Sequence, residues 1–304
     1  MAGRVPTSFR DYVYCMKRLL FCFCLVVGCS AHGATVYTMT GASSPALLTY
    51  DADTLAQTGG INQGTVAIVN DLAFDQTGRL FGVSGFGLLE FDPTTRAIVH
   101  QSPIGAGAGI AVRNGTIYTL TEGFPSVAWV TYDANTLAQT GGVGLGSNAA
   151  VDNLAFDQTG RLFGLSGIGL LEFNPTTLAI IHQSPPGLGG SGIAVRNGTL
   201  YTLLNTFGSV GLVTYDADTF AQTGGAGQGF IALGDDLAFD ENGRLFGVTS
   251  LGLREFNPTT LAVIQQSPYV GTFGIAVRGV PEPSVSLLTA IASACVAGLY
   301  RKRW

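Results

Sequence analysis

The sequence predicts an all-β protein with the fold of a six-bladed β-propeller, closed by pairing of its last inner strand with strands near the N-terminus. Three observations lead to this fold class. A period of 82 to 83 residues runs through positions 34–279, each period divides into two related halves, and no window there keeps a helical spacing of apolar residues. Four-stranded units of about 41 residues, repeated radially, are typical of a β-propeller.

The long period is visible as near-copies of two segments. LLTYDADTLAQTGG and its relatives lie at 47–60, 129–142 and 212–225, and LAFDQTGRLFG and its relatives lie at 72–82, 154–164 and 237–247. Runs rich in Val, Ile, Leu, Phe, Tyr and Thr alternate with turn signals in every copy. Each half-period therefore reads as four short strands.

The turns between these strands have recognisable chemistry. Asn114-Gly115 and Asn197-Gly198 predict hairpin turns, because Asn and Gly both accept a positive φ. The segment 75–78 has Asp first and Gly fourth, as a type I turn prefers. The segments 92–95 and 51–54 are expected to join third strands to fourth strands.

Five complete units are expected, and a sixth that is split between the two ends of the region. The complete units start at Leu72, Ile110, Leu154, Ile193 and Leu237. The inner strand of the sixth is 273–279, and its other three strands are 35–41, 46–53 and 55–60. Closure of the ring in this way removes free sheet edges. These repeats resemble those of NHL-type and YVTN-type propellers.

The N-terminal segment reads as an export signal. Residues 16–33 combine a basic start, the apolar run 19–28 and a small-residue site at 31–33, so the mature chain is expected to begin near Ala34. Residues 1–15 read as the product of an upstream start codon. An alternative is lipoprotein processing at Cys29, because the residues before it resemble a lipobox.

The C-terminal segment 280–304 has three parts in a specific order. Pro281-Glu282-Pro283 comes first, an apolar stretch follows, and Arg301-Lys302-Arg303 closes it. This segment resembles the PEP-CTERM sorting signal of Gram-negative bacteria that produce exopolysaccharide, which implies an exosortase as the processing partner.

Hydropathy alone supports a weaker form of the same expectation. Residues 284–300 would form one transmembrane helix of about 25 Å, with the basic cluster on the cytoplasmic side. A plain tail anchor is the alternative. Either way, the propeller would first be held at the inner membrane facing the periplasm, and would finally lie at the cell surface or in the extracellular matrix.

Composition excludes several classes of function. Residues 34–279 contain no Cys, so neither disulfides nor cysteine-bound metal can support the domain. They contain no Lys, and eight Arg stand against eighteen Asp and Glu, a formal charge of −10. A nucleic-acid partner needs clusters of basic residues, so nucleic acid is excluded.

Comparison of the repeats indicates which face could bind a ligand. The turns after the first and third strands hardly change, whereas the blade-to-blade connectors and the loops between second and third strands do. Both variable sets should emerge on one face. There, at the start of alternate inner strands, lie Asp71, Asn153 and Asp236. Their oxygens could hold a calcium ion or ligand hydroxyls, or could instead cap backbone N–H groups at the channel entrance or bind water.

Other candidates are weaker. His100 and His182 occupy equivalent positions on outermost strands where the third repeat has Gln265, which favours a structural role. The three double blades are near-copies and none has its own cluster of ionisable groups, which argues against an enzyme.

These observations together favour a monomeric binding module for envelope or extracellular polysaccharide. One alternative is a metal-dependent propeller hydrolase or lactonase with Asp71, Asn153 and Asp236 as metal ligands. A second alternative is a structural spacer or a platform for protein interactions.

Overall fold

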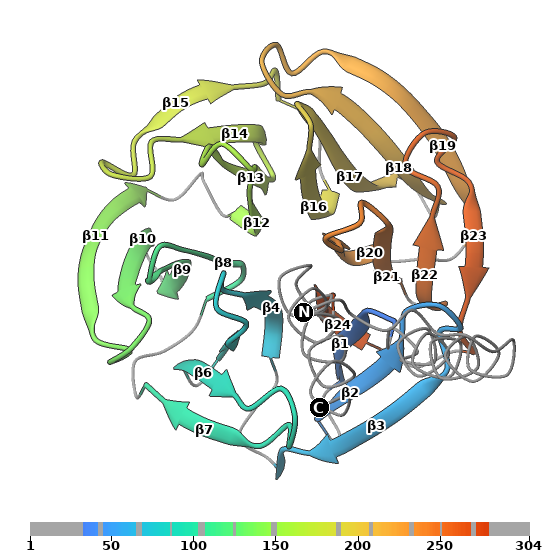
Figure 1. Ribbon diagram of the computed structural model, residues 1–304. Coiled ribbons are helices and arrows are strands. Elements are labelled where there is room, and N and C mark those ends of the chain that lie inside the picture. Colours follow the sequence, from blue (N-terminus) through green and yellow to red (C-terminus); the bar gives the residue numbers. More distant parts are fainter. Residues whose placement is uncertain are drawn as a thin grey trace, which may run out of the picture. The chain divides into compact units, whose positions relative to one another are not determined.

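The computed structural model describes residues 33–279, except for 42–44, 65–68, 86, 103–106, 124–125, 147–150, 187–189, 207–208, 231–233, 250 and 269–271. Residues Ala34–Gly279 form one compact unit of six four-stranded antiparallel sheets, arranged as blades around a central channel (Figure 1). The prediction of a six-bladed all-β propeller is confirmed. Within the described part of the chain, no helix is long and apolar enough to cross a membrane. The expected signal peptide, the sorting signal and the transmembrane helix at 284–300 lie outside the described residues.

The blades are numbered here from the split one, and each is given from its inner to its outer strand. Blade 1 is β24 (Thr272–Arg278), β1 (Thr35–Thr40), β2 (Ala46–Asp51) and β3 (Gln57–Asn62); blade 2 is β4 (Val69–Phe74), β5 (Leu80–Ser84), β6 (Gly87–Phe91) and β7 (Ile98–Gln101). Blade 3 is β8 (Ile110–Arg113), β9 (Thr116–Gly123), β10 (Ser126–Asp133) and β11 (Gln139–Gly146); blade 4 is β12 (Val151–Phe156), β13 (Leu162–Ser166), β14 (Gly169–Phe173) and β15 (Ile180–Gln183). Blade 5 is β16 (Gly190–Arg196), β17 (Thr199–Thr206), β18 (Ser209–Asp216) and β19 (Gln222–Phe230); blade 6 is β20 (Gly234–Phe239), β21 (Leu245–Thr249), β22 (Gly252–Phe256) and β23 (Val263–Gln266).

The ring closes as the sequence predicts. The last strand, β24, pairs antiparallel with β1, from Thr35 opposite Arg278 to Thr40 opposite Thr272. In Figure 1 the red β24 accordingly lies beside the blue β1, although almost the whole domain separates them in sequence. The inner edge of β1 is thus paired rather than free.

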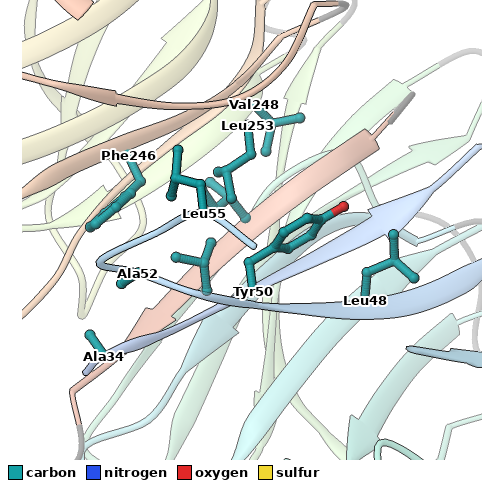
Figure 2. Packing of buried hydrophobic residues seen from close by; sticks show 10 residues of the cluster. Ala34, Leu48, Tyr50, Ala52, Leu55, Phe246, Val248 and Leu253 are labelled. Atoms are coloured by element: carbon teal, nitrogen blue, oxygen red, sulfur yellow. The ribbon is translucent and has the colours of Figure 1, made fainter. Parts of the chain in front are cut away.

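The hydrophobic core is divided into six layers, one between each pair of neighbouring blades. Figure 2 shows the layer between blades 6 and 1, where Phe246, Val248 and Leu253 face Tyr50 and Leu55. All five are at most 2% exposed. Alternation along each strand explains this arrangement, because successive side chains point to opposite faces of a blade and each face meets a neighbour.

The two faces of the ring differ in their connections. We call the mouth face the one at which the inner strands begin and the blade-to-blade connectors emerge, and the turn face the opposite one. On the mouth face, the β9–β10 and β17–β18 hairpins each continue two residue pairs beyond the equivalent hairpins of blades 2, 4 and 6. Two residues of strand add about 7 Å, so blades 3 and 5 project further there.

On the turn face, the turns are built on side-chain caps. Asn114 and Gly115 have φ values of 50° and 74°, as the predicted hairpin turn requires. In the turn after β2, Asp51 Oδ1 accepts hydrogen bonds from the N–H groups of Asp53 and Thr54. The following residue, Leu55, has a φ of 51°. Burial of its side chain offsets this left-handed conformation, which the sequence pattern did not predict.

Candidate functional site

The three polar residues that the sequence singled out meet at the mouth of the channel. Asp71 lies on β4, Asn153 on β12 and Asp236 on β20, and each is at most 4% exposed. The pairing register shifts by one residue just before each of them, which marks a β-bulge. A bulge changes the direction of the side chain that follows it. Here a bulge precedes each of the three polar side chains, which come from every second blade.

The side chain of Asp236 interacts with those of both other residues at the channel mouth. Asn153 Nδ2 donates to Asp236 Oδ1 at 2.7 Å. The carboxyl groups of Asp71 and Asp236 also lie within hydrogen-bonding reach of each other at the channel mouth. The polar side chains of blades 2, 4 and 6 thus form one connected group at the channel mouth.

The same carboxyl oxygens cap backbone N–H groups. Asp71 accepts from Leu72 N at 2.7 Å through Oδ1 and from Ile110 N at 2.8 Å through Oδ2. Asp236 does the same on blade 6: its Oδ1 accepts from Leu237 N at 2.7 Å and its Oδ2 from Ile275 N at 2.8 Å. Each carboxyl therefore ties its own inner strand to that of the next blade. This is the capping role that the sequence left as an alternative.

Burial sets the proton affinity of the pair. Loss of hydration raises the pKa of Asp71 well above its usual range, and the neighbouring charge of Asp236 adds to the effect. Burial also raises the pKa of Asp236, to about 6, while the hydrogen bonds that it accepts oppose the increase. Both shifts have the same direction, so the two buried carboxyls bind a proton more tightly than exposed aspartates would.

Glycines in the intervening blades make room for this group. A Cβ atom at Gly109, Gly192 or Gly274 would lie 2.8–2.9 Å from the Cα of the polar residue on the next inner strand. No side chain fits at that distance. The alternation of a polar residue and a glycine around the ring is thus required by the close approach of the inner strands.

Below the polar group runs the channel, with a volume of about 280 Å³. Each inner strand pairs with the second strand on one side only, so its other backbone edge faces this space. At the turn-face end, Phe74, Phe156 and Phe239 line the channel. The channel therefore offers backbone groups and apolar side chains, with titratable groups at its mouth.

The chemistry of this site favours a proton over a metal ion. Among the residues whose positions are described, no group of three His, Cys, Asp or Glu side chains could hold a metal. Asn153 directs its amide N–H, not its oxygen, at Asp236. A calcium ion needs six to eight oxygen ligands, so it would have to displace the shared proton and recruit water. The calcium site stays a prediction.

His182 and Gln265, which were noted from the sequence, and the buried Trp129 have packing roles. His182 stacks on Phe220 of the next blade with ring centroids 4.2 Å apart, and Gln265 donates to Glu255 Oε2 at 2.7 Å. Trp129 is fully buried and packs edge-on against Phe173 at 4.6 Å. No asymmetric cluster of ionisable groups emerges from them.

Arginine is the residue type whose role sequence reasoning missed. Arg244 binds Glu255 of its own blade through Nε and Nη2, at 2.8 and 3.0 Å, and also donates to Ala52 O and Asp53 of the next blade. Arg79 and Arg161 make the same bridge between blades 2 and 3 and between blades 4 and 5. We call these three bridges the arginine clasps.

A second set of arginines crosses the remaining interfaces. Arg113, Arg196 and Arg278 donate to backbone carbonyls of the next blade at 2.9–3.1 Å and lie over its phenylalanine rings. Six of the eight arginines of residues 34–279 are therefore engaged between blades, on the turn face. The repeated spacing of eleven residues between clasp Arg and Glu was the signal available in the sequence.

Comparison with known proteins shows the fold. No family model matches the chain, and a search of curated proteins gives no match. A protein of unknown function from Bacteroides caccae is 11% identical with a TM-score of 0.62, over 81% of this chain and 98% of that one. A functionally unknown protein from Desulfotomaculum acetoxidans is 14% identical with a TM-score of 0.60, over 81% and 99%.

A chain of a nidogen–laminin complex is also similar, at 11% identity and a TM-score of 0.60, over 80% of this chain and 98% of that one. At these identities the likeness shows a propeller fold and nothing about the ligand. The resemblances to NHL-type and YVTN-type repeats and to the PEP-CTERM signal stay predictions.

Proposed function

We propose that this protein is an exported binding module that uses the mouth face of its propeller to bind a neutral polysaccharide of the cell envelope or extracellular matrix. The proposal rests on the structural difference between the two faces of the propeller. The turn face is nearly identical in all repeats and is occupied by arginine clasps and capped turns, whereas the mouth face varies in sequence and carries the projecting hairpins.

The charge distribution favours a neutral glycan over an anionic one. The domain has a formal charge of −10, lacks lysine, and uses six of its eight arginines between blades. An anionic polymer would meet a surface of its own sign with few free cations. Hydroxyl groups, by contrast, pair well with backbone and amide groups such as those in the mouth-face loops.

The terminal segments supply the location in this proposal. A signal peptide at 16–33 would export the chain, and the segment 280–304 would hold it at the inner membrane until an exosortase acts near Pro281-Glu282-Pro283. The likeness to a nidogen–laminin chain is compatible with a binding role but does not extend to its partner.

The test is co-sedimentation of purified 34–279 with neutral and anionic polysaccharides, each with calcium and with chelator. One variant shortens the β9–β10 hairpin by its two extra residue pairs. The matched control, Asp92→Asn, changes a turn-face cap to the residue found at the equivalent Asn174, whose Oδ1 accepts the same two N–H bonds at 2.9 Å. We expect binding to the neutral polymer, loss of binding in the shortened variant, and normal binding by the control.

Each other outcome has a definite meaning. Preference for the anionic polymer would contradict the charge argument. Binding that survives removal of the hairpins of both blade 3 and blade 5 would contradict the assignment of the mouth face. Absence of binding to any polysaccharide would overturn the proposal in favour of a protein-interaction platform.

A further inference from the structure

Two carboxyl groups that hydrogen-bond to each other need a proton between them. Asp71 and Asp236 are in this arrangement at the channel mouth, and each is 2% exposed. The contact therefore exists only while that proton is present. Without it, two carboxylates would face each other in a poorly hydrated site, which is strongly unfavourable.

The pair lies on both sides of the strand that closes the ring. Asp71 is on blade 2 and Asp236 on blade 6, and β24 of the split blade 1 runs between them. Asp236 Oδ2 holds Ile275 N of β24 at 2.8 Å. On its other side, β24 packs against Asp71, because a Cβ atom at Gly274 would lie only 2.8 Å from Asp71 Cα. Separation of the two carboxyl groups would thus act directly on β24.

No described cation offsets the charge of the pair. The positively charged side chains on the inner strands are Arg113, Arg196 and Arg278, which lie at the turn-face ends of β8, β16 and β24 and bond to carbonyls there. The paired second strands β1, β5, β13, β17 and β21 carry no Asp, Glu, His, Lys or Arg.

Three more acidic residues lie on the surrounding strands: Asp152 on β12, Asp235 on β20 and Glu122 on β9. Their side chains are outside the described part of the structure. Their charge is negative, so they can only add to the repulsion that follows loss of the proton. Asn153 and the backbone N–H groups are the groups in contact that favour a carboxylate.

We propose that the proton shared by Asp71 and Asp236 makes the closure of the propeller depend on pH. Binding of this proton as the pH falls stabilises β24 in the ring, and its loss as the pH rises weakens the attachment of β24. The geometry of the pair and its place beside the closing strand carry this inference, which does not depend on the ligand of the mouth face.

The direction follows from proton linkage. Both acids have a higher pKa in the folded than in the unfolded chain, so the folded state binds the proton more tightly. Their contribution to stability is complete below the unfolded pKa of about 4 and is lost as the pH rises through the folded values. For Asp236 the loss extends to a pH of about 6, and for Asp71 its direction is the same.

The test compares thermal unfolding midpoints of 34–279 between pH 5 and pH 8. One linked proton corresponds to about 3–5 °C per pH unit for a domain of this size. Asp71→Asn keeps a donor to Asp236 but cannot titrate, so its midpoint should change less with pH than that of the parent. Asn153→Asp adds a third carboxyl and should increase the dependence. Glu241→Gln, at an exposed turn, is the control for net charge and should leave the dependence unchanged.

Infrared spectroscopy in D₂O provides a second readout that does not require the variants to be stable. The folded parent protein should show the carbonyl band of a protonated carboxylic acid at about pH 7.5, where Asp236 alone would be ionised, and Asp71→Asn should lack it. Equal pH dependence in parent and Asp71→Asn, or absence of that band, would overturn the proposal. Stabilisation by calcium chloride at pH 8, with loss of the acid band, would overturn it in favour of a cation site.

Discussion

Replacement of Arg244 by methionine should weaken the interface between blades 6 and 1, at which the ring closes. The change removes the two bonds from Arg244 to Glu255 and the bonds to Ala52 O and Asp53. It leaves the side chain of Glu255, 7% exposed, with Gln265 Nε2 as the neighbouring donor at 2.7 Å. Figure 2 shows the apolar layer of this interface, including Phe246, over whose ring the guanidinium of Arg244 lies.

The magnitude follows from the burial of the two partners. Loss of one partner from a buried ion pair costs about 3–5 kcal/mol, because the other charge is left without compensation. The Arg244 side chain is 26% exposed, so water can partly replace it, and Gln265 remains. We therefore expect a loss of about 2–3 kcal/mol, equivalent to about 4–12 °C in the unfolding midpoint. The contact with Asp53, which is 62% exposed, should contribute little.

A double-mutant cycle measured by urea unfolding separates the clasp from the packing of the arginine stem. Glu255→Met should restore most of the stability lost in Arg244→Met, because it removes the uncompensated buried carboxylate. Asp53→Asn is the exposed control and should be near neutral. Additive losses in the double variant would refute the argument, as they would show that the two side chains stabilise the interface independently.

Three further changes test other parts of the structure. A chain that ends at residue 271 lacks β24, so blade 1 keeps only three strands; we expect lower solubility and a non-cooperative unfolding transition, observable by calorimetry, and a normal transition would contradict the closure argument. Gly192→Ala places a Cβ atom 2.8 Å from the backbone of the next inner strand and should cost about 1–3 kcal/mol, whereas Gly227→Ala, with open space around it, should change the free energy of unfolding by less than about 0.5 kcal/mol. At Asp133, backbone N–H bonds lower the pKa, so its contribution is present at neutral pH and lost as the pH falls below about 4. Asp133→Asn should match the parent at pH 7 and lose less stability at pH 3 in thermal unfolding, and a larger acid loss would contradict the cap.

The sequence was sufficient for the architecture because repetition and turn chemistry are local signals. The split of blade 1, for example, follows from a third copy of the inner-strand motif at 273–279, after which the repeated sequence does not continue. The left-handed Leu55 could not be predicted, because the burial that offsets its conformation depends on a blade that is distant in sequence. The arginine clasps were within reach, since Arg and Glu recur eleven residues apart, but their partner carbonyls belong to other blades.

The candidate site was predicted as a set of residues but not as a chemical unit. Repetition identified Asp71, Asn153 and Asp236 and placed them at the channel mouth. Whether their oxygens face a cation, water or one another depends on the bulges in β4, β12 and β20 and on how closely the inner strands approach. These are tertiary properties, and they decide between a metal site and a shared proton.

The channel also gives a physical reason why the repeat is two blades long and not one. If every inner strand carried an acid at this position, six buried carboxyl groups would converge on one axis, and most would have to be protonated. With glycine on alternate strands only three side chains meet, and with an amide at position 153 only two of them titrate. One proton and one amide N–H are then enough to satisfy the group. The polar–glycine alternation keeps the inner strands close together at the smallest electrostatic cost, which ties the 82-to-83-residue period to the closure of the ring.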